Sequence, residues 1–121
     1  SISQAAAVAA LSDSQLCVET MCAEFRKRHD WLVPALNQLP GLACMAGAGA
    51  FYVFLDASAA IEAMSLDGDS AFCEHLLEKA GVALVPGSAF GAPGHARISF
   101  ACGLDTLKDA VSRIADALPS D

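Results

Sequence analysis

The chain carries, at positions 96–101, the stretch Ala96-Arg97-Ile98-Ser99-Phe100-Ala101, in which apolar and polar residues alternate. This alternation is typical of a half-buried β-strand, because successive side chains of a strand point to opposite faces. Ile98 and Phe100 therefore share one face, and Arg97 and Ser99 share the other. The sequence predicts a sheet packed on helices, with Arg97 pointing away from the core.

Other short apolar segments and several helical patterns surround this strand along the chain. Strands are expected at residues 42–46, 51–55 and 82–85, and the first two form a hairpin around the turn Gly47-Ala48-Gly49. The segment Pro86–Gly94 is rich in glycine and proline and is expected to be a loop. Helices are expected at residues 4–11, 12–39, 56–64, 69–80 and 104–118.

The second of these helices is expected to be long and kinked. Ser12-Asp13-Ser14-Gln15 has the pattern of a capping box and predicts its start. Pro34 predicts a kink near residues 30–33, and Pro40-Gly41 predicts the end. Its apolar stripe consists of Cys17, Met21, Phe25, Leu32, Leu36 and Leu39.

The helix at 69–80 has a cap signal at each end: Asp69 is expected to be its N-cap, and Gly81 its left-handed C-terminal residue. Short strands packed by helices, preceded by a long kinked helix, predict an α+β fold, a two-layer sandwich.

Composition limits the functional classes. The chain has 121 residues and a net charge of −7, and its basic residues form no patch beyond Arg26-Lys27-Arg28, which we interpret as a solvated helix face. We therefore expect no nucleic-acid partner. No apolar run approaches the roughly 20 residues needed to cross a bilayer, so no membrane partner is expected. The five widely spaced cysteines suggest buried thiols in a reducing cytoplasm and neither a metal site nor disulfides.

The other motifs predict no chemistry of their own. Gly47-Ala48-Gly49 precedes a strand and lacks the third glycine of a dinucleotide-binding turn. Gly87-Ser88-Ala89-Phe90-Gly91 matches neither a phosphate-binding loop nor a nucleophile elbow, so Ser88 is interpreted as a turn residue. The three histidines, His29, His75 and His95, are interpreted as surface or packing residues.

Arg97 is the main candidate site residue. The fork of donors on a guanidinium suits bidentate capture of a carboxylate, and a strand beside a glycine-rich loop would hold that fork firmly. From the residues alone, an arginine on a solvent face is the simpler interpretation. Both interpretations stay open at this point.

Three stretches together resemble the C-terminal domain of the fold-type I pyridoxal-phosphate aminotransferases, most of all the bacterial aspartate aminotransferases. They are residues 49–56 (Gly-Ala-Phe-Tyr-Val-Phe-Leu-Asp), residues 80–91 (Ala-Gly-Val-Ala-Leu-Val-Pro-Gly-Ser-Ala-Phe-Gly) and residues 96–101. The likeness extends over nearly the whole chain. It implies that residues 1–12 are the tail of a large pyridoxal-phosphate domain and that residues 13–121 are the small domain.

The resemblance also implies roles for two residues. Arg97 would bind the substrate α-carboxylate, and Phe51 would be a weaker candidate for lining the site. The family's Schiff-base lysine lies in a Ser-Lys segment followed by glycine and arginine, and Lys27, Lys79 and Lys108 have no such context. No catalytic and no cofactor-binding residue is therefore expected in this chain, and without the lysine it is expected to be inactive alone.

The implied function is amino-group transfer between an amino acid and a 2-oxo acid through pyridoxal phosphate in the intact, cytoplasmic polypeptide, as a homodimer. The expected partner of this chain is the large domain. An apolar fraction of 55% and the alanine-rich residues 5–11 agree with a cut interface. The alternative is a free-standing, non-catalytic α+β module that binds a small carboxylate ligand or a protein partner.

Overall fold

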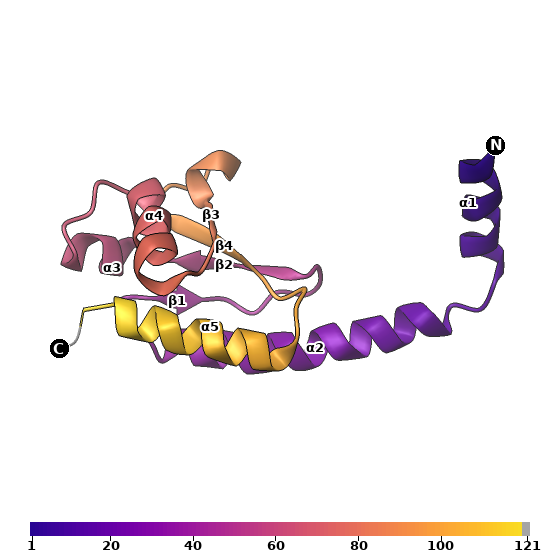
Figure 1. Cartoon of the computed structure of the whole chain (residues 1–121), viewed down its shortest axis with the longest axis horizontal. Helices are drawn as coiled ribbons and strands as arrows, with labels where there is room; N and C mark the ends of the chain where they lie inside the picture. The colour runs from indigo at the N-terminus through magenta and orange to yellow at the C-terminus, as the bar shows by residue number, and fades with distance from the viewer. Residues whose placement is uncertain (120–121) are drawn as a thin grey trace.

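A computed structural model describes residues 1–119 of the chain (Figure 1). Its elements, in chain order, are α1 (Ile2–Ser12), α2 (Leu16–Asn37), β1 (Ala43–Cys44), β2 (Tyr52–Asp56), α3 (Ser58–Ala63), α4 (Asp69–Ala80), β3 (Val85–Pro86), the 3₁₀ turn η1 (Gly87–Phe90), β4 (His95–Ser99) and α5 (Leu104–Ala117).

The four strands form one antiparallel sheet in the order β1-β2-β4-β3. β1 and β2 form the predicted hairpin. In the centre of the sheet, Arg97 of β4 lies between two cross-strand neighbours, Phe54 on β2 and Val85 on β3. Arg97 is thus held by backbone ladders on both sides, which fixes where its side chain leaves the sheet.

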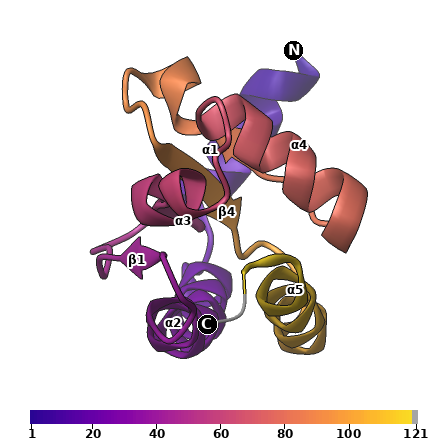
Figure 2. The ribbon, with the colours of Figure 1, turned by 90° about the vertical axis from the view of Figure 1, so that its left-hand side faces the viewer.

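The core lies between one face of the sheet and the helices α2, α4 and α5 (Figure 2). Alternation sorts the strand residues as predicted, because Val53, Leu55, Ala96 and Ile98 are buried in that core. The helices contribute fully buried residues, among them Leu36 of α2 and Phe72 of α4. This arrangement of short strands against helices confirms the α+β prediction.

The N-terminal segment stands apart from this core. Figure 1 shows α1 beyond the free end of α2, away from the sheet, and α1 has no buried residue. Of the predicted apolar stripe of α2, Leu32 and Leu36 are buried, whereas Met21 is 51% exposed. The stripe therefore meets the core from Phe25 onward and leaves it toward the start of the helix.

Two helix starts differ from the prediction. Ser12 is the last residue of α1, and the capping box forms instead at Ser1 and Gln4. The Gln15 side chain donates to the carbonyl oxygens of Ala10 and Asp13, so it bridges the two helices and does not complete a capping box. Likewise Asp69 is the first helical residue of α4 and Gly68 is the N-cap, because the Asp69 carboxylate is engaged elsewhere.

The strand boundaries also shift. Residues 82–84 lie outside the sheet, and β3 is limited to Val85 and Pro86. Phe51 lies in a bend before β2, and β4 ends at Ser99, two residues before the predicted end. α2 continues through Pro34 to Asn37, and Gly81 takes the predicted left-handed conformation, with φ +65°.

The cysteines are all free thiols, but they are not all buried as expected. Cys44 and Cys73 are buried, and burial raises the pKa of the Cys73 thiol to about 11. Cys17 and Cys22 are exposed on the half of α2 that leaves the core. In residues 1–119 no cluster of acidic, histidine or cysteine side chains is arranged to hold a metal ion. None of the described helices has the length and apolarity required to span a membrane.

Candidate functional site

The face of the sheet opposite the core presents Arg97 between aromatic rings. The Arg97 Cζ atom lies 5.1 Å from the centre of the Tyr52 ring and 5.0 Å from that of the Phe90 ring. Tyr52 comes from β2, on one side of β4, whereas Phe90 comes from η1, which follows β3 on the other side of β4. The guanidinium is therefore flanked from two directions, and each contact is worth about 0.5–2 kcal/mol depending on its exposure.

The rings also contact one another. Phe54, directly across from Arg97 on β2, packs edge-on against Phe90 with the ring centres 5.7 Å apart. On its other side Phe54 lies 6.5 Å from the His95 ring. Together these rings surround the base of the Arg97 side chain with apolar surface and restrict its rotamers.

The donors of the Arg97 guanidinium are available to an external ligand. Within residues 1–119, no carboxylate forms an ion pair with Arg97, and its side chain makes no hydrogen bond. A cation–π contact stabilises the positive charge but accepts no hydrogen bond from the N–H groups in the guanidinium plane. A planar, pre-positioned fork of this kind matches the two oxygens of a carboxylate.

The turn η1, which carries Phe90, is held in place by hydrogen bonds to the buried carboxylate of Asp69. Asp69 is only 5% exposed, and its two carboxylate oxygens accept from the backbone N–H and the hydroxyl of Ser88, each at 2.7 Å. These hydrogen bonds from Ser88 hold the pKa of Asp69 below its usual range. The interpretation of Ser88 as a turn residue is confirmed, and its turn leads directly to Phe90.

A second polar group lies further along the same face. The Asp56 carboxylate accepts hydrogen bonds from the backbone N–H and the hydroxyl of Ser58, and these bonds, with nearby His95, lower its pKa. His95 Nδ1 donates to the carbonyl of Pro93 at 3.0 Å. Asp56 and His95 line a groove of about 670 Å³ together with Tyr52 and Phe54. The groove begins beside the ring that contacts Arg97.

Phe51, the weaker candidate, lies one ring away from Arg97. Its side chain is 48% exposed and packs edge-on against Tyr52, with ring centres 5.6 Å apart. Its carbonyl accepts from the backbone N–H of Phe100. The preceding residue, Ala50, has φ +65°. Phe51 thus extends the aromatic surface around Arg97 without contacting the arginine itself in this arrangement.

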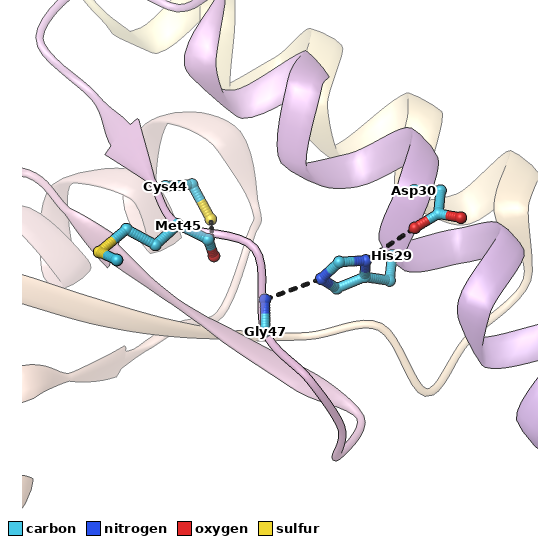
Figure 3. A network of polar contacts seen from close by, with 5 residues as sticks. All are labelled: His29, Asp30, Cys44, Met45 and Gly47. Atoms are coloured by element: carbon cyan, nitrogen blue, oxygen red, sulfur yellow. Dashed lines mark hydrogen bonds and ion pairs between the residues drawn. The ribbon is translucent and has the colours of Figure 1, made fainter.

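The loop before Phe51 is tied to α2 by a histidine (Figure 3). The Gly47 backbone N–H donates to His29 Nε2 at 3.0 Å, so the other nitrogen, Nδ1, carries the proton that faces the Asp30 carboxylate, also at 3.0 Å. Nearby, the Cys44 thiol faces the Met45 carbonyl at 3.7 Å. His29 is therefore a packing histidine, as interpreted, but its tie to the loop has no local sequence signal.

The basic run on α2 is less uniform than expected. Lys27 is exposed and pairs with Glu24 at 3.7 Å, as a solvated face predicts. Arg28 instead is partly buried, lies over the Phe25 ring and donates to the Phe100 carbonyl at 3.3 Å. The prediction is wrong for Arg28, because the end of β4 crosses this part of α2.

The three lysines all lie on helices, away from the exposed face of the sheet. Lys27 is paired on α2, Lys108 of α5 lies 5.8 Å from the centre of the Trp31 ring, and Lys79 is in the last turn of α4. None is beside Arg97. The described residues therefore do not fit the Schiff-base site of pyridoxal phosphate.

Comparison with known proteins adds to this geometry. A family model described as aminotransferase class I and II matches residues 1–114. The chain is 47% identical over 124 residues to the aspartate/prephenate aminotransferase of Nitrosomonas europaea, covering 98% of this chain and 31% of the relative. It is 46% identical over 114 residues to the aspartate aminotransferase of Geobacillus stearothermophilus, covering 94% of this chain and 29% of the relative.

Solved structures agree with these relatives. The chain matches the aspartate aminotransferase of Rhizobium meliloti with a TM-score of 0.85 and 40% identity, over 98% of this chain and 32% of that one. The alanine aminotransferase of Pyrococcus furiosus matches with a TM-score of 0.84 and 30% identity, over 92% and 28%. The chain thus spans about a third of the length of the proteins that it matches.

Proposed function

Since the chain belongs to the class I and II aminotransferases, we propose that it is the C-terminal part of a longer aminotransferase, in which Arg97 binds the substrate α-carboxylate. The substrates are an amino acid and a 2-oxo acid, and aspartate is the first amino donor to test because several relatives carry its name. One observation carries the proposal: Arg97 is flanked by two rings on the exposed face, and no carboxylate of residues 1–119 is paired with it.

The contribution of this chain is to bind and orient. Arg97 forms two parallel charge-assisted hydrogen bonds with the carboxylate, and the flanking rings keep the guanidinium from swinging out to solvent. Such a clamp fixes the direction in which the substrate Cα–H bond points. Tyr52 borders this clamp, and Phe51 packs against Tyr52.

The proton transfers and the electron sink come from elsewhere in the intact polypeptide. Pyridoxal phosphate supplies the electron sink when bound, and the lysine that holds it lies outside this chain. The positions of the lysines, none of them beside Arg97, support the expectation that the 121-residue chain is inactive alone and binds no cofactor of its own.

The exposed apolar side chains of α1 and the start of α2 suggest where the rest of the polypeptide packs. Leu11 is 85% exposed, and Ile2, Val8 and Leu16 are also exposed on this arm. Several exposed apolar side chains on neighbouring elements are typical of an interface. We assign it to the large domain of the same chain, with residues 1–12 as the tail of that domain; the intact enzyme is a cytoplasmic homodimer.

The test replaces Arg97 with lysine in the full-length enzyme. Lysine keeps the charge but loses the planar fork, so kcat/KM for aspartate is expected to fall by about 30- to 4,000-fold, the equivalent of roughly 2–5 kcal/mol. Arg113→Lys is the matched control, because Arg113 is exposed on α5 and paired with Asp109. This control should leave kcat/KM unchanged.

Two results would overturn the proposal. Near-normal kcat/KM in Arg97→Lys would remove the assigned role of the arginine. A full-length protein without transaminase activity toward any amino acid, combined with carboxylate binding by the 121-residue chain alone, would favour the non-catalytic binding module.

A further inference from the structure

We propose that Asp69 is a positioning residue for Arg97 and that it acts through Ser88 and Phe90; this inference rests on the proposed binding of the substrate carboxylate by Arg97. Asp69 does not contact Arg97. It anchors the turn that holds one of the two rings beside the guanidinium.

The first link is the anchor itself. Asp69 is the first residue of α4 and is almost fully buried. Both carboxylate oxygens are used by one partner residue, since Oδ2 accepts from the Ser88 N–H and Oδ1 from the Ser88 hydroxyl. A two-point contact fixes the orientation of Ser88 as well as its position, and charge-assisted bonds of 2.7 Å are among the strong ones.

The second link is the rigidity of η1. The Ala92 N–H donates to the Gly87 carbonyl at 2.9 Å, and the Gly91 N–H donates to the Ser88 carbonyl at 3.2 Å. A Cβ atom at Gly87 would stand 2.2 Å from the Ala92 carbonyl oxygen, so the turn closes tightly on itself. The position of Ser88 is therefore transmitted over two residues to Phe90.

The third link is the ring. Phe90 is 50% exposed, and the aromatic and cationic groups that it contacts are Phe54 and Arg97. A half-exposed ring has too little buried area to fix its own place, so its position depends on the backbone that carries it. If the Asp69 anchor is lost, the Phe90 ring and then the Arg97 guanidinium gain conformational freedom.

The experiment uses the full-length holoenzyme with Asp69→Asn, which removes the charge and one acceptor oxygen. A looser Arg97 binds substrate more weakly, so KM for the amino acid should rise by about 2- to 30-fold, the range seen for residues that act through a neighbour. The turnover number kcat should change by less than about 2-fold, because the reacting groups are untouched. Asp105→Asn, in the exposed first turn of α5, is the matched control.

Ser88 supplies the rescue. Ser88→Ala removes the hydroxyl bond and keeps the backbone N–H bond, so it should raise KM by no more than Asp69→Asn does. The rise in KM of the double variant should be smaller than the two single effects combined, because both changes act on one contact. Ser88→Thr keeps the hydroxyl and should return KM close to the original value. If Asp69→Asn does not fold, these Ser88 variants decide the question.

The outcomes separate this inference from the proposed function. If Arg97→Lys abolishes most activity while Asp69→Asn and Ser88→Ala lower only the thermal midpoint and leave KM unchanged, Asp69 is merely structural and the inference is wrong. If Arg97→Lys itself has normal kcat/KM, the proposed function fails first. A raised KM in Asp69→Asn and Ser88→Ala, with rescue by Ser88→Thr, supports the inference.

Discussion

Arg97 combines two kinds of contact that do not compete. The centres of the Tyr52 and Phe90 rings lie 5.1 and 5.0 Å from its Cζ atom, and the rings stabilise the positive charge. The N–H groups at the edges of the guanidinium remain for a carboxylate. Lysine, a compact charge with a flexible stem, cannot satisfy both demands at once, which is why Arg97→Lys is a sharp test.

Asp69 makes the fold sensitive to acid. Its pKa is lowered in the folded chain, so its contribution to the free energy of unfolding is present above the unfolded pKa, near 4, and is lost as pH falls through the folded value. We predict that Asp69→Asn lowers the free energy of unfolding of the chain by about 1–3 kcal/mol at pH 7. The gap should shrink below pH ~4, because the original carboxyl is then protonated as well.

Urea denaturation of the original chain and of Asp69→Asn, at pH 7 and near pH 3, measures the difference in their free energies of unfolding. Asp105→Asn, whose side chain is exposed, should differ from the original chain by less than about 0.5 kcal/mol at pH 7. An Asp69→Asn gap of constant size at both pH values would contradict the assignment of the stabilisation to the ionised carboxylate.

The face on which Arg97 lies could be predicted from the sequence, but its neighbours could not. Alternation in residues 96–101 places Arg97 opposite the core, since period-2 patterning is a local property of the chain. Phe90 reaches Arg97 from a separate turn, and Asp69 reaches Ser88 across 19 positions. Contacts of this range depend on how elements pack, and no spacing rule in one sequence encodes them.

The helix starts show the same limit. Ser12-x-x-Gln15 and Ser1-x-x-Gln4 have the same local pattern, yet only the second forms a capping box. The Gln15 side chain bonds to carbonyls of the preceding helix, so tertiary geometry at the junction of α1 and α2 overrides the local signal. By contrast, Gly81 ends α4 as predicted, because the left-handed conformation there favours a residue without a Cβ.

A substitution in the helix α1 tests the proposed interface with the large domain. Val8 is 64% exposed, so Val8→Ser should change the unfolding free energy of the 121-residue chain by less than about 0.5 kcal/mol. If α1 packs against the large domain in the full-length enzyme, as proposed, the same change should cost about 1.5–3 kcal/mol there through lost apolar burial. Chemical denaturation of both proteins measures the two values, and equal small effects in both would place the interface elsewhere.

Residues 1–119 comprise a core of sheet and helices, and α1 with the start of α2 extends away from that core (Figure 1). The composition of the chain, 55% apolar, exceeds what the core alone requires, and exposed side chains on α1 and the start of α2 account for part of the excess. The same division explains the chemistry. Under the proposed function, this chain supplies the carboxylate clamp, and the reacting groups lie in the part of the enzyme that corresponds to the other two thirds of its relatives.

The most direct test of this account is the affinity of the full-length holoenzyme for succinate, a carboxylate that cannot be transaminated. Isothermal titration compares the original enzyme with Arg97→Lys, and Arg113→Lys is the control. If Arg97 clamps the carboxylate, Kd should rise by about 30-fold or more in Arg97→Lys, the loss expected for a truncated, buried charge pair, and stay constant in the control. An unchanged Kd in Arg97→Lys would contradict the account.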